Sequence, residues 1–321
     1  MNMKIIFFGS NDISSFLLEF LIKKNFQVLA VVTHEDKPKG RGLKISYPEV
    51  KKTALNYGLK ILQPSSLYDS TFLTELKQLQ ADIYIVVAFK KLPTEVWSIP
   101  PYGTINVHFS LLPEYRGAAP INWVIINCEK ITGITIFFIN DNLDEGDIIL
   151  FKEIKIPEGI TAGKLKELLL PISADLLENA LELIAKKNYS LIQQNELIID
   201  KTKLKKAPKI TSDICKINWN LPATKIDCLI RGLSPIPGAF CYLFNESINK
   251  KLLFKILYSK PIEGEHNYLP GKILTDSKSY FYITAKHGLV EILECQLENK
   301  KVLKVKDFLN GFRNLHEWKI L

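Results

Sequence analysis

The chain has 321 residues, of which 47% are hydrophobic, so it is long enough to form two domains with substantial cores. No apolar stretch reaches the ~18 residues that a membrane span needs, and the N-terminal MNMKIIFFGSND lacks the features of a signal peptide. The five cysteines include no C-x-x-C pair, so we expect no zinc site, and their odd number argues against a disulfide framework. We therefore expect a cytoplasmic protein in a reducing compartment, with no metal and no contact with membranes.

The charge is unevenly distributed along the chain. Residues 1–204 contain 23 basic and 23 acidic side chains, so the whole formal net charge of +8 lies beyond Leu204. A basic segment joined to a neutral one favours a polyanionic partner, and nucleic acid ranks ahead of anionic lipid because no strongly amphipathic basic helix is evident. A solvated lysine-rich surface is the alternative interpretation of the same charge.

In chain order, the first part of the sequence alternates short apolar strands with amphipathic helices. The predicted strands are Lys4–Phe8, Gln27–Val32, Asp82–Val87 and Thr104–Val107, and the predicted helices are Ile13–Lys24, Pro48–Tyr57 and Asp69–Leu79. This alternation predicts an α/β fold with a doubly wound, mostly parallel sheet. Ligands bind outside the carboxyl ends of the strands in such sheets. The turn after the first strand has only Gly9, where a dinucleotide site needs three glycines, so we expect no NAD.

The pattern changes twice in the remainder of the chain. A helix is predicted from Pro120 to Asn127, followed by strands Thr132–Ile139 and Ile148–Ile156 and by a long helix Thr161–Lys187. A polar stretch follows, and beyond Pro208 short strands alternate with turns, which is typical of a small β-barrel of the oligonucleotide-binding type. We therefore predict a first domain over 1–188, a linker over 189–207 and a C-terminal β-barrel over 208–321.

The best candidate chemistry lies at the end of strand Thr104–Val107. Asn106 and His108 are two positions apart, so their side chains share one face of the strand. An amide donor beside an imidazole suits a carbonyl oxygen that gains negative charge during a reaction. Asp144 in the loop LDEGD supplies a carboxylate that can orient an imidazole and relay a proton. A hydrogen-bonded core pair and an acidic turn are the alternatives.

Several motifs together resemble the enzymes that transfer a formyl group from 10-formyltetrahydrofolate. The resemblance rests on NVHFSLLPEYRGAAPINW and TGITIFFINDNLDEGDII, with FFGSNDIS, KPKGRGLK, QPSSL and IRGLSPIPGAF along nearly the whole chain. It implies that Asn106, His108 and Asp144 are catalytic and that no metal takes part. It also implies that the folate pocket is lined by Ser110, Leu111, Leu112 and Pro113.

Within this family, the motifs are most similar to those of members that formylate methionyl initiator tRNA. The resemblance implies that the loop around KPKGRGLK binds tRNA through Lys37, Lys39, Arg41 and Lys44, that the C-terminal barrel also binds tRNA, and that the protein is a monomer. The sequence departs from the family at Ala88-Phe89-Lys90, near the expected pterin site, and at Ser10-Asn11.

Other readings of the sequence stay open. An amino-sugar nucleotide is the main alternative acceptor, since Asn122-Trp123 also resembles the sugar-nucleotide formyltransferases. A glycinamide ribonucleotide transformylase fits less well, because that family resembles only the first domain. A tRNA-binding module without activity is the alternative of a different class.

Overall fold

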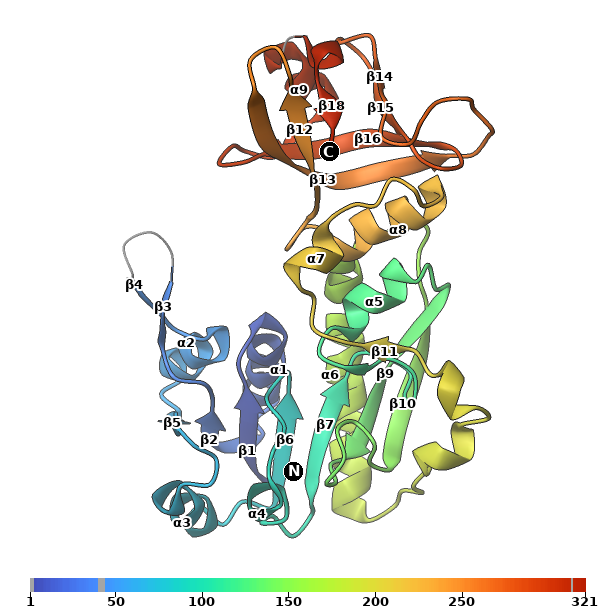
Figure 1. The fold of residues 1–321 in the computed structure, drawn as a ribbon. Helices are drawn as coiled ribbons and strands as arrows, with labels where there is room; N and C mark the ends of the chain where they lie inside the picture. Colours follow the sequence, from blue (N-terminus) through green and yellow to red (C-terminus); the bar gives the residue numbers. More distant parts are fainter. Residues whose placement is uncertain (1–2, 40–43, 313) are drawn as a thin grey trace. The chain divides into compact units, whose positions relative to one another are not determined.

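The computed structural model describes residues 3–39, 44–312 and 314–321, which divide into two compact units (Figure 1). The first unit comprises residues up to Pro120 together with Thr132–Ile154 and Glu167–Lys206, and the second comprises Ile121–Ile131, Lys155–Lys166 and Ala207–Leu321. Each unit therefore combines segments that are distant in sequence. The continuous division into 1–188, 189–207 and 208–321 stays a prediction.

A seven-stranded sheet forms the centre of the first unit, in the order β10-β9-β7-β6-β1-β2-β5 (Figure 1). The strands are β1 (Lys4–Gly9), β2 (Gln27–Val32), β5 (Lys60–Leu62), β6 (Ile83–Val87), β7 (Thr104–His108), β9 (Ile131–Phe138) and β10 (Ile148–Lys155). Neighbours from β5 to β7 are parallel, and β9 runs antiparallel to β7. The predicted mostly parallel, doubly wound sheet is confirmed.

The helices connect these strands. They are α1 (Asp12–Lys23), α2 (Glu49–Asn56), α3 (Ser70–Gln78), α4 (Thr94–Trp97), α5 (Pro120–Ile126) and α6 (Ala162–Lys186). Predicted helices and strands up to residue 187 begin and end within one residue of the observed bounds, whereas several short elements, β5 and α4 among them, were not predicted. Among the described residues, no helix has both the length and the apolar character needed to cross a membrane.

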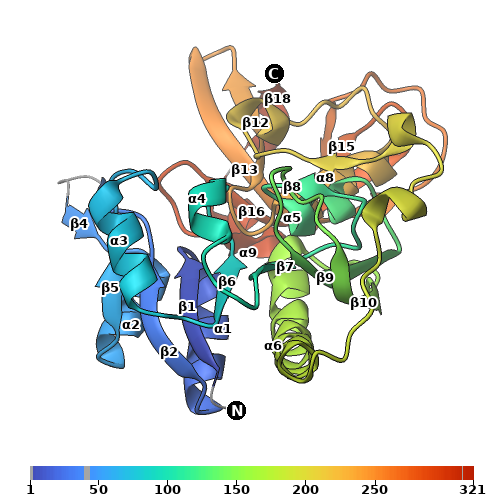
Figure 2. The ribbon, with the colours of Figure 1, turned by 90° about the horizontal axis from the view of Figure 1, so that it is seen from below.

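One face of the sheet packs against α3 and α4 (Figure 2). Ile6 and Phe8 alternate along β1 and share a buried cluster with Phe72 and Leu76 of α3. The α1 helix begins after Asn11, whose Oδ1 accepts a hydrogen bond from the Ser14 amide at 3.1 Å. This side-chain cap explains how the chain turns from β1 directly into a helix.

The strand order reverses between β1 and β6. The chain first adds β2 and β5 on one side of β1 and then places β6 and β7 on the other side. The carboxyl ends of β1, β6 and β7 therefore meet at one edge of the sheet, where open α/β sheets bind their ligands. Asn106 and His108 lie at the carboxyl end of β7, and Asn106 pairs with Val86 of β6.

An antiparallel sheet forms most of the second unit. Its order is β14-β15-β16-β13-β12-β18, with β17 (Leu303–Lys304) paired to β16. The strands are β12 (Ala239–Asn245), β13 (Lys250–Ile262), β14 (Ile273–Thr275), β15 (Phe281–Thr284), β16 (Leu289–Leu297) and β18 (Lys319–Ile320). Gly271, just before β14, lies against Ile320 of β18, so the sheet curves into a nearly closed barrel as predicted.

Three helices complete the second unit. They are α7 (Ser212–Cys215), α8 (Ala223–Leu233) and α9 (Val305–Gly311). The α8 helix was not predicted, and its buried residues Ile226, Ile230 and Leu233 share the barrel core with Phe254 of β13. Alternating burial along β12 supplies Ala239, Cys241 and Leu243 to the same core, as the period of a half-buried strand requires.

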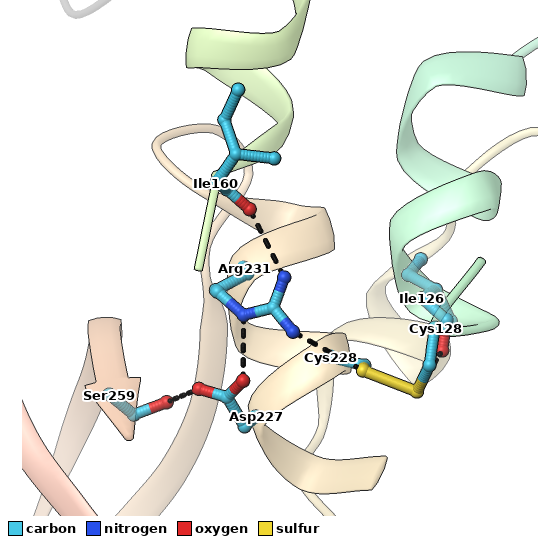
Figure 3. The surroundings of a disulfide bond; sticks show 7 residues. All are labelled: Ile126, Cys128, Ile160, Asp227, Cys228, Arg231 and Ser259. Carbon is cyan, nitrogen blue, oxygen red and sulfur yellow. Dashed lines mark hydrogen bonds and ion pairs between the residues drawn. A yellow bond between two sulfur atoms is a disulfide. The ribbon is translucent and has the colours of Figure 1, made fainter. Parts of the chain in front are cut away.

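A disulfide within the second unit corrects one sequence prediction. Cys128, just after α5, is bonded to Cys228 of α8, and their Cα atoms are 5.6 Å apart (Figure 3). The expectation of no disulfide framework is therefore wrong for this pair. The partners are 100 residues apart in sequence, so neither spacing nor number reveals that the fold brings them together.

A buried ion pair lies beside the disulfide (Figure 3). Arg231 Nε donates to Asp227 Oδ2 at 2.6 Å, and Ser259 Oγ donates to Asp227 Oδ1 at 2.8 Å. The remaining guanidinium nitrogens of Arg231 contact the Ile160 carbonyl oxygen at 3.1 Å and Cys228 Sγ at 3.3 Å. Both oxygens of this carboxylate thus have protein partners.

Candidate active site

The β7 strand presents Asn106 and His108 at the carboxyl edge of the sheet. Both residues point to the same side of the strand, because side chains alternate with a period of two. His108 pairs with Thr135 of β9 and is only 6% exposed, whereas Asn106 is half-buried. The predicted pair therefore lies on a rigid, hydrogen-bonded strand.

The His108 ring is held between two protein groups. Its Nε2 lies 3.0 Å from the Tyr115 carbonyl oxygen, and its Nδ1 lies 3.9 Å from Asp144 Oδ2. A carbonyl oxygen only accepts, so Nε2 must carry a proton in this contact. With that proton on Nε2, Nδ1 is the ring nitrogen that faces the Asp144 carboxylate, and it is the position at which a further proton would bind.

The loop after β9 fixes the Asp144 carboxylate. Asp144 is 7% exposed and has a φ of 55°. This left-handed backbone conformation is unfavourable for any residue that has a Cβ atom. Its Oδ2 accepts a hydrogen bond from the Gly117 amide at 2.9 Å. Gly146, two residues later, packs so closely on β9 that a Cβ atom there would lie 1.6 Å from the Phe138 carbonyl oxygen. Only glycine fits this turn.

Sequence reasoning missed two residues that support this loop. Gln194 is 2% exposed and donates to the carbonyl oxygens of Asp144, at 3.0 Å, and Gly146, at 2.8 Å. Arg116 donates to Gln194 Oε1 and pairs with Glu145. The predicted linker 189–207 contains Gln194, and its polar, irregular composition carries no signal that distinguishes one buried glutamine from its exposed neighbours.

The segment from Ser110 to Pro113 is tightly packed. Ser110 and Leu112 are buried, and Thr135 joins them, because its hydroxyl donates to the Ser110 carbonyl at 2.7 Å and accepts from the Leu112 amide at 3.1 Å. Leu112 shares a small core cluster with Phe137 and Ile148. Leu111 covers Gly133, where a Cβ atom would lie 2.3 Å from its Cδ2. The four residues predicted for the folate pocket thus follow directly from β7 on a fixed backbone.

The loop predicted to bind tRNA is partly described. Lys37 and Lys39 lie on β3 (Lys37–Lys39) and Lys44 lies on β4 (Lys44–Ser46), two short antiparallel strands next to α2 (Figure 1). Arg41 lies outside the described residues. The structure therefore gives a backbone hairpin for this segment.

A polar cluster anchors the start of that hairpin. Lys51 Nζ pairs with Asp36 Oδ2 at 2.6 Å and donates to Gln63 Oε1 at 2.7 Å. Gln63 in turn donates to the His34 carbonyl oxygen at 2.6 Å and to Asp36 Oδ1 at 3.0 Å. The hydrogen bond from Lys51, followed by that from Gln63, holds the pKa of Asp36 below its usual value. The QPSSL motif thus positions the base of the hairpin.

Two grooves of the first unit lie at the opposite edge of the sheet. A groove of about 680 Å³ is lined by Asp82, Pro101, Tyr102, Phe138, Lys187 and Tyr189. A second groove, of about 500 Å³, shares Asp82 and Pro101 with it. Asp82 and Tyr102 precede β6 and β7, so both grooves border the amino ends of parallel strands. Neither groove is lined by Asn106, His108 or Asp144.

Comparison with known proteins identifies the family of the chain. The profile of the formyl transferase family matches residues 3–181, and the profile of the formyl transferase C-terminal domain matches residues 209–313. The chain belongs to the formyl transferase family. It is a formyl-transferring enzyme, and the formyl donor of this family is 10-formyltetrahydrofolate.

Similar sequences extend over almost the whole chain. A methionyl-tRNA formyltransferase of Flavobacterium johnsoniae is 42% identical over 99% of this chain and 99% of its own length. One from Thermodesulfovibrio yellowstonii is 41% identical over 99% of this chain and 98% of its own length. These relatives share both units of the formyl transferase described here.

Solved structures share the fold at lower identity. An N-formyltransferase from Helicobacter canadensis, in complex with folinic acid and dTDP-3-aminofucose, gives a TM-score of 0.63 with 22% identity, over 90% of this chain and 98% of its own. HypX from Aquifex aeolicus, in complex with tetrahydrofolic acid, gives 0.62 with 19% identity, over 98% of this chain and 48% of its own. At this identity the similarity shows the fold alone.

The segment Ala88-Phe89-Lys90, where the sequence departs from the family pattern, has a distinct backbone and packing. Ala88 has a φ of 48°, in the left-handed region. The Phe89 ring then stacks on His34, with centroids 4.8 Å apart, and meets the Phe8 ring edge-on at 5.8 Å. The aromatic side chain that follows β6 therefore packs between the ends of β1 and β2.

The described residues, 3–39, 44–312 and 314–321, show no candidate metal site. In this part of the formyl transferase, no three His, Cys, Asp or Glu side chains gather in a way that would hold an ion.

Proposed function

We propose that this formyl transferase moves the formyl group of 10-formyltetrahydrofolate to the amino group of methionyl initiator tRNA, as a cytoplasmic monomer. The observation that carries the catalytic part is the buried pair of His108 and Asp144, in which Nδ1 of the ring lies 3.9 Å from Oδ2 of the carboxylate. The acceptor is supported by relatives named methionyl-tRNA formyltransferase, which are 38–42% identical. The amino-sugar enzyme of similar fold is only 22% identical.

In this proposal, Asn106, His108 and Asp144 form the catalytic group. The amide of Asn106 donates a hydrogen bond to the formyl oxygen as that oxygen gains negative charge, a contribution worth roughly 3–4 kcal/mol per donor in other enzymes. On Nδ1, His108 takes the proton that the attacking amine loses, and Asp144, which faces Nδ1, helps to relay this proton and balances the charge of the imidazolium. The proton then passes to the leaving nitrogen of the folate, so that the side chains return to their starting state.

The segment from Ser110 to Pro113 is our proposal for one wall of the folate site. Its support is position, because it continues β7 past His108 at the edge where open α/β sheets bind ligands. The Thr135 hydroxyl links two of its backbone groups, which keeps the segment in one conformation. A preformed wall orders few side chains on binding and so favours affinity.

The tRNA-binding groups are Lys37, Lys39, Arg41 and Lys44 together with the basic second unit. Support comes from charge, since the net charge of +8 lies beyond Leu204 and the hairpin adds four cations within eight residues. The anchor formed by Gln63, Asp36 and Lys51 fixes the base of the hairpin.

The acceptor is tested by offering both candidates to the same protein. We expect formylation of methionyl initiator tRNA in the presence of 10-formyltetrahydrofolate and at least ~100-fold lower kcat/KM with a dTDP-amino sugar, since each kcal/mol of lost recognition changes the rate several-fold. A preference for the sugar nucleotide would refute the proposed acceptor. Formylation of neither compound would refute the proposed function.

The hairpin is tested with Arg41→Lys. The charge-matched control is Lys52→Arg, because the Lys52 side chain of α2 is exposed. A lysine keeps the charge but loses the bidentate fork of arginine. We expect Arg41→Lys to lower kcat/KM for the tRNA by about tenfold, which corresponds to about 1.4 kcal/mol, and to leave the KM for folate unchanged. Values within twofold of wild type would remove this loop from the proposal.

A further inference from the structure

Gln194 stands out among the groups that the catalytic proposal leaves unused. It begins the short 3-10 helix Gln194–Leu197 and is 2% exposed, although its neighbour Gln193 is exposed. We infer that Gln194 is a positioning residue for formyl transfer, because it holds the Asp144 loop and the Arg116–Gly117 segment in the register that places Asp144 against His108. The inference rests on the catalytic role proposed for Asp144.

All the hydrogen-bonding capacity of the Gln194 amide is used. Nε2 has two protons, and it donates to the Asp144 carbonyl oxygen at 3.0 Å and to the Gly146 carbonyl oxygen at 2.8 Å. Oε1 accepts from Arg116 Nε at 3.1 Å and from Nη2 at 2.7 Å. These four contacts fix which end of the amide faces which segment, because carbonyl oxygens need a donor and a guanidinium needs an acceptor.

The two carbonyl contacts define the turn that carries the carboxylate. Asp144 has a φ of 55°, and the left-handed region costs an ordinary residue about 1–2 kcal/mol. The bonds from Gln194 to Asp144 and Gly146 lie on either side of Glu145, so they fix the peptide planes of the turn. Without them, the direction of the Asp144 side chain would depend on a turn that costs free energy.

The arginine contacts place the second partner of the carboxylate. Arg116 immediately precedes Gly117, whose amide donates to Asp144 Oδ2 at 2.9 Å. Gln194 therefore bridges the backbone that carries Asp144 and the backbone whose N–H group bonds Asp144. The 3.9 Å gap between Asp144 Oδ2 and His108 Nδ1 is set by these two segments.

The contacts also give the Arg116 guanidinium partners other than the Asp144 carboxylate. Arg116 Nη1 pairs with Glu145 Oε1 at 2.8 Å, while Nε and Nη2 face Gln194. A neutral amide accepts from the guanidinium without adding a negative charge beside Asp144. A glutamate at this position would keep the contact with Arg116 but would offer no proton to the two carbonyl oxygens.

The test compares Gln194→Leu and Gln194→Glu with Gln193→Leu and Gln193→Glu at the adjacent exposed position. We expect both Gln194 variants to lower kcat for formylation of methionyl initiator tRNA by about 10–100-fold, since a misplacement near 1 Å costs about that much. The KM values for tRNA and 10-formyltetrahydrofolate should stay within threefold, and the pH–rate profile should shift. The Gln193 controls should match wild type.

Coupling to Asp144 separates positioning from a general structural role. In an Asp144→Asn background, Gln194→Leu should lower kcat by less than threefold further, because the group that it positions is already lost. A merely structural glutamine would lower activity by the same factor in both backgrounds, and this additive result would overturn the inference. Wild-type kcat and an unchanged pH–rate profile in the Gln194 variants would overturn it too.

Folding and the underlying proposal are controlled separately. Urea unfolding reports whether each variant is folded, and Gln194→Glu, which keeps the shape and the arginine contact, carries the test if Gln194→Leu does not fold. Folded Gln194→Glu with wild-type kcat would refute the inference. If Asp144→Asn alone kept wild-type kcat, the catalytic proposal would fail, whatever Gln194 does.

Discussion

Two buried aspartates, one in each unit, show how differently the same side chain is used. In the second unit, Asp227 is 4% exposed and both of its oxygens are bonded, one to Arg231 and one to Ser259. In the first unit, Asp144 is 7% exposed and shares one oxygen between the Gly117 amide and His108. Among the described residues, no hydrogen bond reaches the other oxygen of Asp144.

The arginine that accompanies each aspartate accounts for the difference. Arg231 binds the Asp227 carboxylate directly, one helical turn away, and neutralises it within the fold. Arg116 is bound instead to Gln194 and Glu145, so among the described residues the Asp144 carboxylate faces the imidazole of His108 and not a guanidinium. A buried carboxylate is therefore a candidate for chemistry when its arginine is occupied elsewhere, and burial alone does not distinguish the two cases.

The largest expected difference between the two aspartates is in turnover. Asp144→Asn should lower kcat by ~100-fold or more, because an amide can neither balance an imidazolium nor relay a proton. Asp227→Asn should leave kcat per folded molecule within twofold of wild type. Formylation kinetics of both variants, with the folded fraction measured by circular dichroism, make the comparison. Equal kcat values would show that the two carboxylates are not functionally distinct.

Stability should show the opposite order. Removing the charge of Asp227 leaves Arg231 buried without its partner, and breaking such a pair costs about 3 kcal/mol. Asp144→Asn should change the free energy of unfolding by less than about 1 kcal/mol, because the Gly117 amide still finds an acceptor there. Urea denaturation at constant pH measures both values. A larger loss for Asp144→Asn than for Asp227→Asn would contradict the distinction.

Reduction of the disulfide should affect only the second unit. The Cys128–Cys228 bond closes a loop of 100 residues, and its loss should lower the free energy of unfolding by about 2 kcal/mol. Unfolding with and without dithiothreitol measures this change, and Cys128→Ala/Cys228→Ala is the control that should not respond. Formylation by the reduced, folded protein should keep its wild-type kcat. A loss of kcat on reduction would connect the second unit to the chemistry.

The smallest expected effect is on the alkylation of two buried thiols of the second unit, Cys241 and Cys295. Burial raises the pKa of Cys295 to about 12 and raises that of Cys241 as well. The thiolate is the reactive form, so at pH 8, below these pKa values, both thiols stay protonated and unreactive. Iodoacetamide followed by mass spectrometry should label Cys241 and Cys295 only after unfolding. Rapid labelling of the native protein would show that this core opens.

Local sequence patterns predicted the strands and helices of the first unit better than they predicted the long-range contacts that hold the site and the second unit together. The period of two placed Asn106 and His108 on one strand face, and the alternation of strands and helices gave the sheet, because both signals lie within about ten residues. Gln194 is 50 residues from Asp144, and Cys128 is 100 residues from Cys228. No periodicity reports contacts at such separations, since they arise only when the sheet brings the segments together.

The helix α8 was missed for a related reason. Its sequence ATKIDCLIRGL ends in a glycine and a turn, and the short strands that follow suggested an all-β unit. The helix is stabilised by its contact with β13, where Ile226, Ile230 and Leu233 are fully buried. Tertiary packing of this kind outweighs the intrinsic propensity of so short a segment.

The position of Gln194 also affects how the protein can be cut for experiments. A fragment that ends at Asn188, where composition suggests the first domain stops, retains every residue of the Asn106-to-Asp147 motifs. It lacks Gln194, the Ile192 backbone that pairs with Ile148, and the Lys205 carbonyl that accepts from Tyr115. We expect such a fragment to lose activity because the loop that carries Asp144 is no longer held by Gln194. An experimenter could then attribute this loss to the missing barrel by mistake. A fragment that continues to Lys206 keeps these three contacts and gives the fair comparison.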